Sequence, residues 1–123
     1  MTQEEKDLLL KDLCARLPYG VKVQTGPRHD DDYNKIIYDN YEVLDFIMMS
    51  IMFKDNIEEY KPCLFPLESM TDEQNHEFLS TCNCYCGYYW TEETFDWLNA
   101  HHFDYRGLIP MGLANDATGL NIY

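Results

Sequence analysis

The cysteines near residue 84 are the residues best suited to metal chemistry. Thiolate and imidazole are common ligands of Zn²⁺, and the chain places three cysteines close together with three histidines elsewhere: Cys82, Cys84, Cys86, His76, His101 and His102. Structural zinc sites pair two cysteines across about two to four residues and repeat the pair further along the chain. That repeat is missing here, so we predict no metal and no cofactor, and we interpret the cysteines as buried thiols. A metal-stabilised domain or a small metal-dependent enzyme is the alternative.

A second group of reactive side chains follows a helix that we predict to begin after Thr91. His101, His102, Asp104 and Arg106 lie within a few residues of one another and are suited to acid–base work. A reaction also needs a nucleophile or a bound metal, and no nucleophile motif or phosphate loop is present in the sequence. We therefore predict no enzyme activity and no catalytic residue. We expect Arg106 to pair with Asp104 or a neighbouring carboxylate, and Gly107 to make the turn that ends the helix.

The distribution of carboxylates supports the main functional prediction. The net charge is −13, from 22 Asp and Glu against 9 Lys and Arg, and residues 62–105 contain no Lys or Arg. Uncompensated carboxylates repel phosphates, which argues against direct binding to nucleic acid or to an anionic membrane. They favour instead a surface that contacts a basic protein. The predicted contact residues are Glu68, Asp72, Glu73, Glu77, Glu92, Glu93 and Asp96.

Length and composition indicate one folded domain over residues 1–123. Hydrophobic residues make up 46% and aromatic residues 15% of the sequence, well above what disordered chains contain. The longest apolar run, residues 46–53, is too short to span a bilayer. The first residues lack the pattern of a secretory signal, and the five cysteines are odd in number. We therefore expect a cytoplasmic protein with reduced thiols.

Helix signals and alternation outline the elements of the first half. Thr2 and Glu5 have capping-box spacing before an apolar helical pattern, which predicts a helix over residues 3–16. A strand is expected at residues 21–24, and residues 25–32 are expected to form an exposed, mobile loop. Residues 35–38 and 41–53 are predicted as strands, with a helix over 43–53 as the competing interpretation. Residues 57–64 are expected to be extended because Pro62 and Pro66 exclude a helix there.

Two helices are predicted in the second half. Thr71 with Gln74 predicts a helix over about residues 72–80, and Thr91 precedes another that contains Phe95 and Trp97. The tail that ends at Tyr123 is expected to dock weakly or not at all. This order indicates an α+β fold with an N-terminal helix, a small antiparallel sheet or partial barrel, and two C-terminal helices.

Three stretches of the sequence resemble a known family. Residues 1–21 are MTQEEKDLLLKDLCARLPYGV, residues 61–71 are KPCLFPLESMT, and residues 96–109 are DWLNAHHFDYRGLI. In these stretches, somewhat under half of its length, the chain resembles short uncharacterised proteins of gut Bacteroidales and of their phages and mobile elements. The resemblance implies a bacterial or phage cytoplasm and transfers no site residue.

The preferred functional hypothesis is an acidic protein-binding module. Such a module, encoded by a phage or a mobile element, would inhibit a basic host protein that binds nucleic acid or acts in defence. A structural homo-oligomer that associates through the apolar residues 41–53 is a further alternative.

Overall fold

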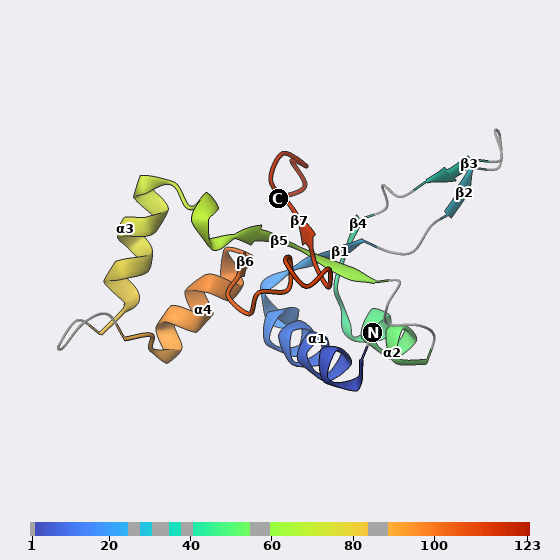
Figure 1. Cartoon of the computed structure of the whole chain (residues 1–123), viewed down its shortest axis with the longest axis horizontal. Helices are drawn as coiled ribbons and strands as arrows, with labels where there is room; N and C mark the ends of the chain where they lie inside the picture. The colour runs from blue at the N-terminus through green and yellow to red at the C-terminus, as the bar shows by residue number, and fades with distance from the viewer. Residues whose placement is uncertain (1, 25–27, 31–34, 38–40, 55–59, 84–88) are drawn as a thin grey trace.

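The computed structural model describes residues 2–24, 28–30, 35–37, 41–54, 60–83 and 89–123 (Figure 1). Helix α1 (Gln3–Arg16) begins where Thr2 Oγ1 accepts a hydrogen bond of 3.1 Å from the Glu5 amide, and it has the predicted bounds. The short 3-10 helix η1 (Leu17–Tyr19) follows and ends at Gly20, whose φ of 71° suits a residue without a Cβ.

A small mixed sheet lies beside α1. It contains β1 (Lys22–Gln24), β4 (Tyr41–Val43), β5 (Lys61–Pro66) and β6 (Phe103–Asp104) in the order β4-β1-β5-β6, while β7 (Asn115–Asp116) also pairs with β5. The β1–β4 and β1–β5 pairs are antiparallel, but β6 and β7 run parallel to β5. The α+β class is therefore confirmed, with a sheet that is mixed where we predicted an antiparallel one. The helices between β5 and β6 provide the long crossover that a parallel pair requires.

The apolar run predicted as a strand is mostly a helix. Residues 41–43 form β4, but α2 (Phe46–Lys54) follows, as in the competing interpretation. Asp45 decides between the two, because its carboxylate accepts a hydrogen bond of 2.7 Å from the Met48 amide and caps the helix start. The run itself is apolar on every side and therefore carries no period of its own.

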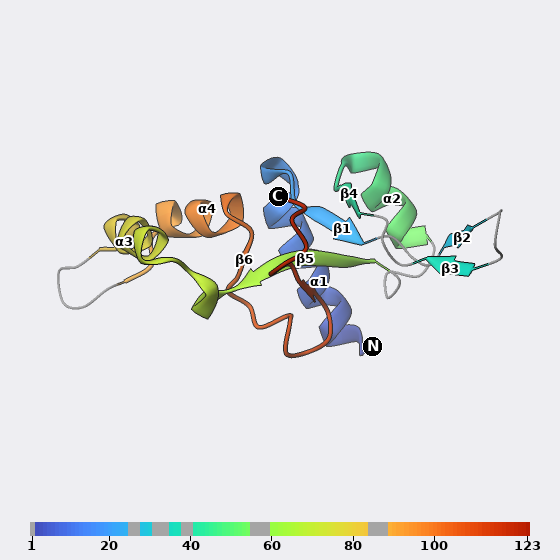
Figure 2. The same ribbon diagram turned by 90° about the horizontal axis from the view of Figure 1, so that it is seen from above.

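A separate two-stranded sheet contains part of the predicted loop. Strand β2 (Arg28–Asp30) pairs antiparallel with β3 (Lys35–Ile37), so the loop prediction is wrong for residues 28–30. The strand prediction is confirmed for residues 35–37. In both views this sheet projects from one end of the molecule (Figures 1 and 2).

Helices α3 (Asp72–Thr81) and α4 (Glu92–Ala100) form a hairpin at the opposite end (Figures 1 and 2). The short 3-10 helix η3 (Leu67–Ser69) connects β5 to this hairpin. Each long helix begins with a capping box, Thr71 with Gln74 and Thr91 with Thr94. Both helices were predicted, because the capping side chains and the first-turn carboxylates are local signals.

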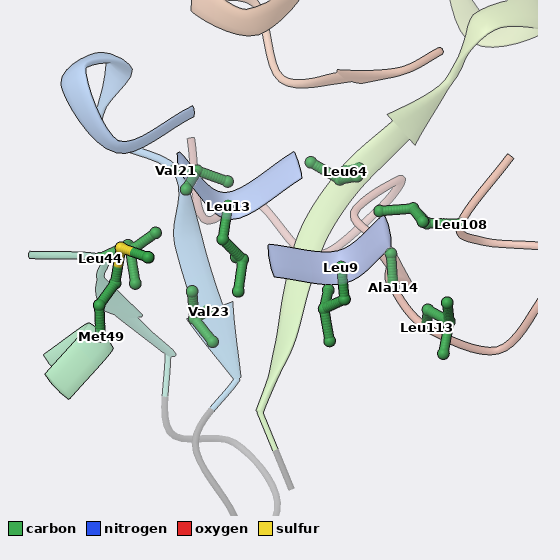
Figure 3. Packing of buried hydrophobic residues seen from close by; sticks show 10 residues of the cluster. All are labelled: Leu9, Leu13, Val21, Val23, Leu44, Met49, Leu64, Leu108, Leu113 and Ala114. Atoms are coloured by element: carbon green, nitrogen blue, oxygen red, sulfur yellow. The ribbon is translucent and has the colours of Figure 1, made fainter. Parts of the chain in front are cut away.

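The main core lies between α1, the sheet and the segment after β6 (Figure 3). Leu9 and Leu13 of α1 lie over β1 and β5, and Leu108, Leu113 and Ala114 lie beside β5 (Figure 3). The ten core residues are Leu9, Leu13, Val21, Val23, Leu44, Met49, Leu64, Leu108, Leu113 and Ala114.

The segment that ends the sequence is docked on the sheet, so the prediction of weak docking is wrong. Strand β7 pairs with β5 at Cys63 and Leu64. The Tyr123 hydroxyl accepts a hydrogen bond of 2.7 Å from the Lys22 amide and donates one of 2.8 Å to the Cys63 carbonyl. One side chain thus satisfies backbone groups of two neighbouring strands, which sequence patterns do not reveal.

Candidate functional site

The seven predicted contact carboxylates are all exposed. Glu68 lies in η3, and the others lie on α3 and α4. None of them forms a salt bridge with a residue in the described part of the chain. Asp96 accepts a hydrogen bond of 3.0 Å from the Tyr19 hydroxyl. The hairpin therefore presents carboxylate charge to solvent with little internal compensation.

Aromatic rings lie among these carboxylates, and sequence reasoning did not group them. Phe78 of α3 contacts Trp90 at 5.7 Å and Trp97 at 5.9 Å between ring centroids, which holds the two helices together. Trp90 contacts Phe95 at 5.5 Å, and Phe95 contacts Tyr105 at 5.4 Å. Trp90 and Phe95 each keep 40% of their surface exposed. The contact between Trp90 and Phe95 could have been predicted from the sequence. Trp90 precedes the N-cap Thr91 and Phe95 is the fourth helical residue, which is the spacing of a hydrophobic staple.

A buried charge network lies behind this cluster. The Asp12 carboxylate pairs with Arg16 Nε at 2.8 Å and with Arg106 Nε at 3.2 Å, and neither Asp12 nor Arg16 has exposed surface. Arg16 Nη2 also donates a hydrogen bond of 2.6 Å to the Phe103 carbonyl. Arg106 therefore pairs with a carboxylate of α1 and not with Asp104.

Asp104 has a different role from the one we predicted. Its carboxylate accepts hydrogen bonds from the Leu108 amide at 3.0 Å and the Ile109 amide at 2.9 Å, so it orders the loop that follows β6. Gly107, with φ of 76°, lies in this loop. It does not end α4, because that helix ends at Ala100 and His102 already adopts φ of 62°.

The two adjacent histidines stack on different rings. His101 lies on Trp97 at 4.2 Å between centroids, and His102 stacks on Tyr123 at 3.9 Å with an interplanar angle of 14°. Burial lowers the pKa of His102 to about 4, and the positive charge of Arg16 adds to the effect. His102 is therefore neutral at ordinary pH and part of the packing.

The predicted absence of metal ligands stays a prediction. Cys84 and Cys86 lie outside the described residues. The Cys82 thiol donates a hydrogen bond to the Phe78 carbonyl and accepts one from the Thr94 hydroxyl. Among the described residues, no three His, Cys, Asp or Glu side chains are close enough to hold one ion.

Two surface pockets accompany these features. One of about 350 Å³ lies between η3 and the segment after β6, and its lining includes Glu68, Asp104, Tyr105 and Asp116. The other, of about 460 Å³, lies between α1 and α2 and is lined by Cys14, Leu17, Phe46, Met49 and Ser50. The lining of the first combines carboxylates with apolar side chains such as Leu67 and Ile109, and the second is apolar.

No family model, curated protein or solved structure matches this chain. Within the described residues, no helix has the length and apolar character that crossing a membrane requires. The geometry and charge of the hairpin are therefore the basis for a functional proposal.

The lowered pKa of His102 leads to a prediction about pH. An unfolded histidine titrates near pH 6.5, so between about pH 6.5 and 4 the unfolded chain binds a proton that the folded chain does not. The free energy of unfolding should be at its full value above this window and fall as pH drops through it, by about 2 kcal/mol. Urea unfolding at about pH 7 and pH 4.5 measures the loss.

The matched control for this prediction is His102→Asn. Asparagine tolerates the positive φ at this position and does not titrate. Carboxylate titration affects both proteins alike, so the wild type should lose more stability than the variant between the two pH values. Equal losses in the two proteins would contradict the assignment.

Proposed function

We propose that the protein is an acidic protein-binding module that contacts a basic surface of another protein through the α3–α4 hairpin. The observation that carries this proposal is the set of seven exposed carboxylates on η3, α3 and α4 without salt-bridge partners in the described chain. The stretch from residue 62 to 105 also contains no Lys or Arg. Such a surface attracts cationic groups, accelerates association with them and disfavours acidic partners.

The chemistry of the partner follows from the sign of the charge. A nucleic-acid-binding protein has a cationic groove that an array of carboxylates can occupy in place of phosphates. The resemblance to proteins of Bacteroidales phages and mobile elements favours a bacterial cytoplasm as the setting and a host nucleic-acid-binding or defence protein as the target. In that setting, occupation of the groove would inhibit the target.

The proposal predicts a charge-dependent affinity that is specific to the hairpin. The partner is first identified by capture from a host lysate at low salt, and its Kd is then measured with purified proteins. The double variant Glu77→Gln with Glu93→Gln should bind about five- to tenfold more weakly, because each exposed charge contributes a modest amount. Raising the salt concentration should weaken the wild-type complex and reduce the difference.

A matched control removes two exposed carboxylates from α1. Glu4→Gln with Asp7→Asn changes the net charge by the same amount but leaves the hairpin intact. Its Kd should stay within about twofold of the wild type. Equal weakening of the two variants, or failure to retain any basic protein at low salt, would refute the proposal.

A second candidate function is self-association through the apolar surface of β4 and α2. Phe46 and Ile47 are 78% and 73% exposed, and Val43 is 51% exposed. They adjoin the apolar pocket of about 460 Å³ between α1 and α2. Light scattering separates this function from the first, because the mean mass of a homo-oligomer rises with protein concentration. Added salt should strengthen self-association, since it screens the repulsion between two chains of charge −13.

A further inference from the structure

Three aromatic rings near the start of α4 form a triangle of edge-to-face contacts. Trp90, Phe95 and Tyr105 are 5.4 to 6.4 Å apart between centroids, with interplanar angles of 65° to 83°. Trp90 and Phe95 are the exposed members, and Tyr105 is partly buried. We refer to these three residues as the aromatic triangle. Its exposed side offers ring surface to a partner.

Carboxylates lie directly beside the triangle. Glu92 is three residues before Phe95 and one turn away along α4, so the two side chains are neighbours on the helix surface. Asp96 follows Phe95 in α4, and its carboxylate accepts the hydrogen bond from the Tyr19 hydroxyl. This hydrogen bond raises the pKa of Tyr19, and burial and the charges of Asp96 and Glu92 add to the effect. Negative charge and ring surface therefore occur within one small area.

The fold already places guanidinium groups on the inner ring of the triangle. The guanidinium carbon of Arg16 is 5.1 Å from the Tyr105 ring centroid, and that of Arg106 is 4.9 Å from it. Within the described residues no Lys or Arg lies over Trp90 or Phe95. The exposed rings of Trp90 and Phe95 are aromatic surfaces like that of Tyr105. They are open to a cation from a partner.

We propose that the hairpin selects arginine over lysine in its basic partner, with guanidinium groups stacked on the exposed rings of Trp90 and Phe95, one to a ring, and bonded to Glu92. This inference rests on the proposed function and specifies the partner as an arginine-rich segment. A guanidinium is planar and weakly hydrated, so it stacks on a ring and donates two parallel hydrogen bonds to a carboxylate at once. A lysine ammonium is a strongly hydrated point charge and meets only the carboxylates well.

The test compares two synthetic peptides of equal charge. In peptides of about ten residues, glycine alternates with arginine in one and with lysine in the other, and a fluorescent label reports binding by anisotropy at low salt. The arginine peptide should bind the wild type about five- to thirtyfold more tightly, which corresponds to guanidinium contacts on two exposed rings. Trp90→Leu with Phe95→Leu should abolish this preference and leave the lysine peptide within about twofold.

Two further variants separate ring chemistry from packing. Phe95→Tyr keeps an aromatic ring and should retain the arginine preference. Phe95→Leu should reduce the logarithm of the affinity ratio between the two peptides by about half. Phe46→Leu is the matched control, because Phe46 is an exposed phenylalanine on α2, away from the hairpin. Phe46→Leu should bind both the arginine and the lysine peptide with the affinity of the wild type. Thermal unfolding midpoints near the wild-type value establish that each variant is folded.

The outcomes distinguish this inference from the proposed function. If both peptides bind with the same salt-sensitive affinity, arginine selection is wrong and the acidic module stands. If the leucine variants keep the arginine preference, the rings are not its source and the inference is overturned. If neither peptide binds at low salt, both the inference and the proposed function fail.

Discussion

Replacing Asp12 by alanine is expected to lower the free energy of unfolding by about 3–5 kcal/mol. Asp12 is the only carboxylate that pairs with Arg16 or Arg106 among the described residues, and Asp12 and Arg16 are both fully buried. Removing it leaves the Arg16 charge in the interior, where solvent cannot compensate it. Arg16 Nη1 already has no hydrogen-bond partner in the described structure, and the substitution takes the Asp12 partner away from Arg16 Nε as well.

Urea unfolding measures this loss, and two other variants interpret it. Asp7→Ala removes a carboxylate from the exposed face of the same helix and should cost less than about 1 kcal/mol. Asp12→Leu combined with Arg16→Met replaces the buried pair by apolar side chains and should recover a large part of the stability. A cost below about 1 kcal/mol for Asp12→Ala would show that the contact between Asp12 and Arg106 does not hold α1 to the segment after β6.

Phe103→Ala should destabilise the protein by about 3–5 kcal/mol, because it removes a large side chain from a closed interior. Phe103 is 1% exposed. It stacks on Trp97 of α4 at 5.6 Å with an interplanar angle of 6°, and it contacts Phe65 of β5 at 6.0 Å. The side chain therefore joins the α3–α4 hairpin to the sheet, and its loss should loosen the hairpin first.

Thermal and urea unfolding, followed by tryptophan fluorescence, check this expectation. Both tryptophans belong to the hairpin, so their fluorescence reports its packing directly. Phe103→Leu is the control, since it keeps most of the volume and should cost only about 1–2 kcal/mol. If alanine and leucine at this position cost the same, the buried volume of Phe103 is not the source of the loss, and the expectation is wrong.

Local signals account for the elements that were predicted well. Helices α1, α3 and α4 begin at Thr2, Thr71 and Thr91, where a hydroxyl and the residue three positions later determine the start without distant contacts. The same kind of signal was available for α2, because Asp45 caps it, but the apolar run that follows has no period and was assigned to a strand. Competing local preferences therefore explain this error.

Part of the candidate site could be predicted from the same kind of local signal. The exposed carboxylates follow from charge and helix position, and the contact between Trp90 and Phe95 follows from the hydrophobic-staple spacing. The approach of Tyr105 and Tyr19 to α4 does not follow from any local pattern. This approach completes the aromatic triangle and holds the Asp96 carboxylate, whereas the proposed arginine preference rests on Trp90, Phe95 and Glu92.

The sequence by itself determined the α+β class, the three capped helices and the acidic surface of the hairpin, since these depend on side chains a few residues apart and on the sum of charges. Only the tertiary structure decided that Arg106 pairs with Asp12 across 94 positions and that Tyr123 bonds to the Cys63 carbonyl across 60. It also decided that β6 and β7 lie parallel to β5. Such contacts form only when the whole core is closed, because their gain must exceed the entropy of closing long loops, and no local pattern specifies which distant groups will meet.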